Sequence, residues 1–235
     1  METVYSKAAR YYDKLYAGKD YKGEVQRLVA LLDVDADQKT PTLLDVACGS
    51  GRHLEYLREY FHGEGLDLCP EFLETARERN PSMSFHLGDM IDFDLGKRFD
   101  VVTCLFGSIG YVKTLDKLRS AVRAMAAHLK PGGRLAIEPW FTPETWHPNA
   151  VHAFFIDEPE LKIARINTSF VTDGLSILDL HYVVGTPEGT EHFLEHHELG
   201  LFSVKEMISA LKEAGLSAHY DSIGLNGRGL YICKK

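Results

Sequence analysis

The stretch that decides the fold is LLDVACGSGRHLEYL, residues 43–57. A short apolar run enters a turn that contains Gly49 and Gly51, and a helical pattern follows. A strand that leads through a glycine turn into a helix is a common site for a pyrophosphate, a triphosphate or a nucleoside. The residues in and around the turn indicate which of these ligands it binds.

This turn lacks the residues that phosphate binding requires. A P-loop needs a lysine directly after its last glycine, and none follows Gly51. The dinucleotide fingerprint needs a third glycine where this chain has Leu54, a bulky residue that opposes close packing of the helix. Asp45 lies inside the preceding strand, where its carboxylate would repel a pyrophosphate. The sequence therefore predicts a ligand with a positively charged end.

Around this stretch, short apolar runs alternate with longer amphipathic ones. Strands are predicted over residues 42–47, 62–68, 84–89, 99–106 and 134–139, and helices over residues 51–61, 70–80 and 115–130. We expect the Pro-Gly-Gly at 131–133 to end the last of these helices. Alternating strands and helices predict an α/β fold, with a doubly wound, mostly parallel sheet covered by helices on both faces.

The alternation ends at Pro139. Residues 140–149 are rich in proline and tryptophan and predict a loop, and three runs of strand composition follow at 162–171, 175–185 and 190–202. Glycine-bearing turns separate these runs, which predicts a small antiparallel insert. A capped helix over 203–215 and a terminal antiparallel hairpin complete the chain. We expect one domain, 1–235, in which the insert at 140–202 covers the active site.

Composition narrows the function classes. The chain has 235 residues, a net charge of −8 and no dense run of lysine or arginine, so nucleic acid is not an expected partner. The four cysteines are scattered without metal-binding spacing, which is typical of a reduced protein. No apolar segment has the length of a membrane span or a signal core, so no membrane partner is expected and we expect a cytoplasmic enzyme.

Two further acidic residues follow the next strands. Asp67 ends the second strand, where it can accept hydrogen bonds from ribose hydroxyls, and Asp89 ends the third, where it can accept from an adenine amino group. Each aspartate alone has a purely structural interpretation as a helix cap or a solvated side chain. Together with Asp45 they describe S-adenosylmethionine, which carries positive charge and lacks phosphate.

These motifs resemble a known superfamily. LLDVACGSG, GLDL, GDM and PGGRLAIEP, followed by the terminal hairpin, resemble the class I S-adenosylmethionine-dependent methyltransferases. The segments YYDKLYAGKDY, GDMIDFDLGKRFDVVTCLFGSIGY, EPWFTPETW and GRGLY are more narrowly similar to the N,N-dimethyltransferases of nucleotide-linked 3-amino-3,6-dideoxysugars, the desosamine and mycaminose type. The resemblance implies S-adenosylmethionine as cofactor and the amino group of a dTDP-linked deoxyamino sugar as acceptor.

The resemblance and the strand-end pattern together give a set of expected cofactor contacts. The backbone around Ala47, Gly49 and Gly51 is expected to hold the methionine part. The full set is Tyr12, Lys19, Asp45, Ala47, Gly49, Gly51, Asp67, Leu68, Asp89, Met90 and Leu105.

The predicted reaction depends more on aligning the acceptor with the methyl group than on a strong general base. Methyl transfer is an in-line displacement, and an amine acceptor needs only to lose a proton. No metal-ligand spacing is present, and no metal is predicted. Tyr111 follows the fourth strand at a position where some members of the resembled family have histidine. Because a tyrosine has an ordinary pKa near 10, we expect Tyr111 to position the amine, with His181 or His196 of the insert as alternatives for a base.

The acceptor is expected to meet aromatic and cationic residues. Tyr5 and Tyr21 belong to a tyrosine-rich N-terminus that predicts either a lid or an amphipathic helix packed on the core. The resemblance gives Tyr5 a substrate-side position, and we expect it, with Tyr111, to be a catalytic residue. Trp140 offers a flat wall, unless it is a core residue. Arg228 lies between two glycines, where it either pairs with a diphosphate or is a solvated turn residue.

Other functions stay open at this point. A methyltransferase for another small acceptor, such as a glycine-type amine or a sugar hydroxyl, shares the cofactor motifs. A non-catalytic S-adenosylmethionine-binding partner or sensor would share them too. We also expect the exposed edges of the antiparallel insert to favour a homodimer.

Overall fold

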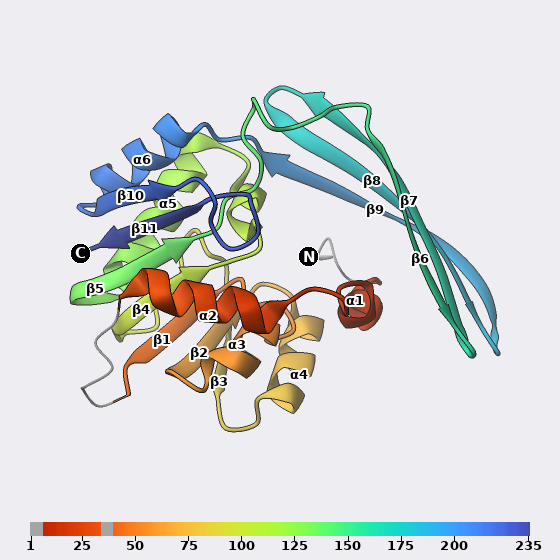
Figure 1. The fold of residues 1–235 in the computed structure, drawn as a ribbon, viewed down its shortest axis with the longest axis horizontal. Coiled ribbons are helices and arrows are strands. Elements are labelled where there is room, and N and C mark those ends of the chain that lie inside the picture. Colours follow the sequence, from red (N-terminus) through yellow and green to blue (C-terminus); the bar gives the residue numbers. More distant parts are fainter. Residues whose placement is uncertain (1–6, 34–39) are drawn as a thin grey trace.

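A seven-stranded sheet forms the centre of the computed structural model, which describes residues 7–33 and 40–235 (Figure 1). Its strand order is β10-β11-β5-β4-β1-β2-β3. β1 to β5 are parallel, and the terminal hairpin adds β11 antiparallel to β5. The strands are β1 Thr42–Val46, β2 His62–Asp67, β3 Ser84–Leu87, β4 Phe99–Cys104, β5 Leu129–Ile137, β10 Ser217–Asp221 and β11 Leu230–Lys234. The predicted doubly wound sheet with its terminal hairpin is confirmed.

Helices cover both faces of this sheet because consecutive apolar residues in its strands point to opposite sides. Leu43 of β1 packs in one core with α2 and α3, whereas its neighbour Leu44 packs in the other with α5 and α6. The helices are α1 Ala9–Leu15, α2 Tyr21–Leu32, α3 Arg52–Leu57, α4 Pro70–Arg79, α5 Leu115–Ala127 and α6 Val204–Glu213, with a short 3₁₀ helix η1 at Ser108–Val112.

One predicted boundary is wrong. The Pro-Gly-Gly at 131–133 does not separate a helix from a strand, because α5 has already ended at Ala127 and β5 runs through the segment. The segment makes a bulge in the pairing with β4, and the C-terminus hydrogen-bonds to it from the other side, with the Gly132 N–H donating to the Lys235 carbonyl at 3.1 Å. Pairing with distant strands thus overrides the local turn signal.

The insert is a separate antiparallel sheet of four strands in the order β6-β7-β8-β9, one more than the three predicted. The strands are β6 Val151–Glu158, β7 Leu161–Thr172, β8 Leu175–Thr186 and β9 Gly189–Gly200. β6 was not predicted because Phe154 and Phe155 break the alternation of polar and apolar residues, and because the turn before β7 has no glycine. Consequently the layer is larger than the sequence indicated.

The N-terminal helix α1 lies between the insert and the α/β body (Figure 1). Ala8, Tyr11 and Leu15 pack against the concave inner face of the insert, in a cluster with Ile163, Tyr182, Val184 and Phe193. On its other side, the Tyr12 ring meets the Phe72 ring of α4 edge-on, with centroids 4.9 Å apart. The tyrosine-rich segment is therefore both an amphipathic helix and part of the wall between the two sheets.

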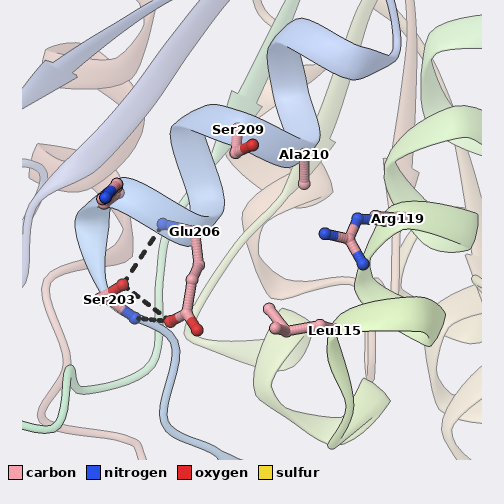
Figure 2. Close-up of a pocket in the computed structure, with 7 residues that line it drawn as sticks. Leu115, Arg119, Ser203, Glu206, Ser209 and Ala210 are labelled. Atoms are coloured by element: carbon pink, nitrogen blue, oxygen red, sulfur yellow. Dashed lines mark hydrogen bonds between the residues drawn. The ribbon is translucent and has the colours of Figure 1, made fainter.

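A recess of about 330 Å³ lies between the first turns of α5 and α6 (Figure 2). Its polar groups serve the helix rather than a ligand. The Ser203 N–H donates to Glu206 Oε2 at 2.8 Å, and the Glu206 N–H donates to Ser203 Oγ at 3.3 Å, so the predicted capping box is confirmed.

None of the helices within residues 7–33 and 40–235 is long and apolar enough to cross a membrane.

We predict that Ser203→Ala lowers the free energy of unfolding by about 1 kcal/mol, because it leaves the first-turn N–H groups of α6 without their cap. Ser209→Ala on the same helix is the matched control. Its hydroxyl bonds only Glu213 at an exposed site, so the change should stay within about 0.5 kcal/mol. Urea unfolding measures both, and equal losses would contradict the role given to the cap.

Candidate active site

Two buried carboxylates mark the carboxyl ends of β1 and β2. Asp45 is only 1% exposed, and the Thr103 hydroxyl of β4 donates to its Oδ1 at 2.7 Å. Asp67 accepts from the N–H of Gly49 at 2.7 Å and from the N–H of Cys69 at 2.9 Å. The parallel register of β1 and β2 therefore brings both acids to one edge of the sheet.

No lysine or arginine among the described residues forms an ion pair with either carboxylate. Burial raises the pKa of Asp45 to about 6, although the nearby His53 and the Thr103 hydroxyl oppose the rise. Burial likewise raises the pKa of Asp67, against the hydrogen bonds from Cys69 and Gly49. Buried acids without a basic partner favour a cationic ligand, as the sequence around the turn predicted.

The glycine turn between β1 and α3 has a fixed and strained backbone. Ala47 has φ 58°, a left-handed conformation that residues with a side chain rarely adopt. Gly51 has φ 73°, and a Cβ there would lie 2.8 Å from Asn80 Nδ2, which donates to the Gly51 carbonyl at 3.1 Å. Both the φ value and the close packing therefore require glycine at 51.

The structure distributes the other predicted cofactor contacts around this edge. Leu68 is half exposed beyond β2, and Asp89 accepts the Ile91 N–H at 3.1 Å just after β3. Met90 packs on the core beside α5, and Leu105 is buried after β4. Their placement around the strand ends agrees with the predicted set, which stays a prediction.

Lys19 is already engaged within the protein. Its ammonium group pairs with the buried Glu24 and lies 4.5 Å from the centre of the Phe106 ring. Burial alone would raise the pKa of Glu24, but hydrogen bonds from His53 and Lys19 lower it to about 2. The expected cofactor contact of Lys19 would have to compete with this pair.

A cavity of about 350 Å³ opens between α1, η1 and the inner face of the insert. Of the predicted site residues, it brings together Tyr12, Tyr111, Trp140 and Arg228. Tyr21 is not among its lining residues but is buried in α2 against the His53 ring, and Tyr5 lies outside the described residues. The cavity has aromatic walls, with the Trp140 indole N–H held by Ser176 Oγ at 2.8 Å.

Arg228 enters this cavity as half of an ion pair. Its Nη2 lies 2.7 Å from Oε1 of Glu138, a fully buried residue that directly follows β5. Glu138 also accepts from the Phe106 N–H at 2.6 Å and from Asn226 Nδ2 at 2.8 Å. Sequence reasoning missed Glu138, although an acid at the end of an apolar strand is the signal that identified Asp67.

A histidine that the sequence did not single out faces Tyr111. The Tyr111 hydroxyl lies 2.8 Å from His197 Nδ1, and both residues line the cavity. His181 and His196 are on the exposed outer face of the insert, where His196 pairs with Asp179 at 2.6 Å. Side chains alternate between the two faces along each strand, so His196 and His197 of β9 point to opposite faces. Neither His181 nor His196, the two histidines considered as a base from sequence, lines the cavity.

Within the described ranges, no three His, Cys, Asp or Glu side chains group in a way that could hold a metal ion.

Comparison with known proteins places this geometry in a family. The methyltransferase domain family matches residues 43–133. The dTDP-3-amino-3,4,6-trideoxy-alpha-D-glucopyranose N,N-dimethyltransferase of Streptomyces venezuelae is 38% identical over 225 residues, 94% of each chain. The chain belongs to the dTDP-amino-sugar N,N-dimethyltransferase family.

Two further comparisons support the assignment. The dTDP-4-amino-2,3,4,6-tetradeoxy-D-glucose N,N-dimethyltransferase of Saccharopolyspora spinosa is 39% identical over 94% of this chain and 90% of its own. The structure of S-adenosylmethionine-bound CalS10, an amino pentose methyltransferase from Micromonospora echinaspora, superposes with a TM-score of 0.84 at 36% identity, covering 100% of this chain and 97% of that one. The prediction of an S-adenosylmethionine-dependent methyltransferase is confirmed.

We predict that Asp45→Asn stabilises the folded protein by about 3 kcal/mol above pH 6. The folded-state pKa of about 6 exceeds the ordinary 3.8, so ionisation of Asp45 opposes folding as pH rises through 6. Asparagine removes that cost while its Oδ1 can still accept from Thr103. The gain should therefore disappear between pH 6 and pH 4, and binding of S-adenosylhomocysteine should weaken.

Asp100→Asn at the opposite edge of the sheet is the control. Partial burial alone would raise the pKa of Asp100, but hydrogen bonds from Lys130 and Thr42 lower it. This substitution should destabilise the protein at neutral pH and leave ligand binding unchanged. Chemical unfolding over pH and calorimetric binding measure both variants, and a loss of stability in Asp45→Asn at neutral pH would contradict the account.

Proposed function

We propose that this protein transfers methyl groups from S-adenosylmethionine to the amino group of a dTDP-linked deoxyamino sugar. The observation that supports the proposal is a pair of features: buried carboxylates at the carboxyl edge of the main sheet, and a cavity with aromatic walls and arginines. Phe106, just beyond the strand β4 that pairs with β1, lines this cavity. The acidic edge suits a cationic donor, and the cavity suits an anionic acceptor with a flat base. The relatives act on such acceptors by their names.

The acidic edge fits S-adenosylmethionine by its chemistry. The uncompensated carboxylates Asp45 and Asp67 suit a ligand with an ammonium and a sulfonium, and the strained turn at Ala47 presents backbone groups beside them. When bound, this cofactor supplies an electrophilic methyl group. The contribution of the chain is to orient donor and acceptor and to exclude water, which together can lower a barrier by about 7–11 kcal/mol.

Arg165 is the cation best placed for the diphosphate. It lies on the inner face of β7 and lines the cavity, and no carboxylate of the described residues pairs with it. No group of the described residues hydrogen-bonds its buried Nε, nor the buried Nδ2 of Asn167 two residues further along the same face. By contrast, Glu138 already neutralises Arg228. We propose that Arg165 and Asn167 bind phosphate oxygens and that Arg228, stacked near Trp140, orients the sugar nucleotide.

We predict that Arg165→Gln weakens binding of dTDP by about 10–100-fold, the worth of one or two charge-assisted hydrogen bonds. Binding of thymidine, which lacks phosphate, should change little. Arg10→Gln is the matched control, since Arg10 lies on the exposed side of α1 and pairs with Glu191. Isothermal calorimetry measures each affinity, and an equal loss for thymidine and dTDP would contradict a diphosphate contact.

Turnover tests the proposed function itself. The protein, S-adenosylmethionine and dTDP-3-amino-3,6-dideoxyglucose should yield products heavier by one and then two methyl groups in mass spectrometry. Glycine and a sugar without an amino group are offered in parallel reactions. Methylation of glycine alone would overturn the acceptor, and no S-adenosylhomocysteine from any acceptor would leave a binding protein rather than an enzyme.

A further inference from the structure

Three side chains form a hydrogen-bonded row behind the cavity. The Tyr111 hydroxyl meets His197 Nδ1 at 2.8 Å, and His197 Nε2 lies 3.4 Å from Glu195 Oε2. The other oxygen of Glu195 accepts the Ala8 N–H at 3.0 Å, which ties the row to the start of α1. His197 is 3% exposed and lines the cavity beside Tyr111, whereas Glu195 is 5% exposed and is not among the described residues that line it.

Each hydrogen bond in the row has an assignable donor and acceptor. Because the Glu195 carboxylate accepts hydrogen bonds, its neighbour Nε2 is the imidazole nitrogen that carries a proton. Nδ1 is then unprotonated and accepts from the Tyr111 hydroxyl. Tyr111 lines the cavity, and a hydroxyl oxygen that donates its own proton can also accept a hydrogen bond from a donor there.

The acceptor chemistry needs such a group. An aliphatic amine arrives largely as an ammonium ion at neutral pH and must lose a proton before its lone pair can attack a methyl carbon. Tyrosine alone is a poor base at that pH, since its ordinary pKa is near 10. No carboxylate is among the described residues that line the cavity, and its bases are the imidazoles of His152 and His197. Of these two, His197 is the one that the Tyr111 hydroxyl contacts.

We propose that His197, acting through the Tyr111 hydroxyl, takes up the proton of the acceptor ammonium while Glu195 stabilises the imidazolium that forms. This inference rests on the proposed amino-sugar acceptor. An ammonium N–H passes its proton to the Tyr111 oxygen as the Tyr111 O–H proton moves to His197 Nδ1, leaving a neutral amine, a neutral tyrosine and an imidazolium. The proton leaves to solvent before the second methylation, for which the cycle repeats.

Other titratable groups face this row from the neighbouring elements. Tyr182 of β8 and Arg165 of β7 share the inner face of the insert, and His152 of β6 lines the same cavity. Tyr12 comes from α1 and Tyr16 directly follows it, and Arg228 comes from the loop before β11. None of these groups is a carboxylate, and the carboxylate that contacts His197 is Glu195. The row can therefore hold a positive charge although arginines lie nearby.

His197→Asn tests the proposal, because the asparagine oxygen can occupy the place of Nδ1 and still accept from Tyr111 without binding a proton. We expect kcat to fall about 100-fold at neutral pH with KM for the sugar nucleotide nearly unchanged. The loss should shrink as the pH rises above the pKa of the acceptor ammonium, because the free amine needs no relay. His181→Asn, on the outer face of the same insert, should retain full activity.

A second readout does not require turnover. In nitrogen-15 NMR spectra of the protein alone, His197 should show a protonated Nε2 and an unprotonated Nδ1, and Tyr111→Phe should shift the Nδ1 signal. A loss of kcat in His197→Asn that is equal at every pH, or a proton resident on Nδ1, would overturn the relay. Failure of the unmodified protein to methylate any nucleotide-linked amino sugar would instead overturn the proposed function.

Discussion

The interaction on which the site depends is the burial of Asp45 and Asp67 at the carboxyl edge of the sheet, where no lysine or arginine of the described residues pairs with them. Raising the pKa of Asp45 from 3.8 to about 6 corresponds to about 3 kcal/mol of unfavourable free energy at neutral pH. A cationic ligand can offset that cost, and the same two acids help to fix the strands and the turn through Thr103 and Gly49. The buried negative charge that suits a cationic ligand therefore lowers the stability of the protein without ligand.

Because side chains alternate between the two faces of each strand, the insert presents one set of residues to the cavity and another to its outer face. Arg165, Asn167, Glu195 and His197 face inward, whereas His181, His196 and several exposed apolar residues face outward. α1 packs into the inner face and closes one side of the cavity. In the proposed mechanism, the main sheet provides the donor site, and the insert with α1 provides the acceptor site. The reaction would then require both sheets to be held in place by a short helix.

Sequence reasoning reached the features that depend on local order. The strand, turn and helix around residues 43–57, the strand-end aspartates and the capping box of α6 each involve residues close in the chain, and their chemistry follows from their spacing. It could not reach pairs set by tertiary contact. Tyr111 and His197 are 86 residues apart, Arg228 and Glu138 are 90 apart, and Ala8 and Glu195 are 187 apart. β6 and the bulge in β5 were missed for the same reason, since distant strands stabilise both.

The most direct measurement is the number of protons released when S-adenosylhomocysteine binds, obtained by calorimetry in buffers of different ionisation enthalpy. If the ligand ammonium offsets the buried charge, Asp45 must lose its proton on binding below its pKa of about 6. The account predicts release approaching one proton below pH 6 and almost none at pH 8. Binding without proton release across this range would contradict the claim that an uncompensated carboxylate selects the ligand.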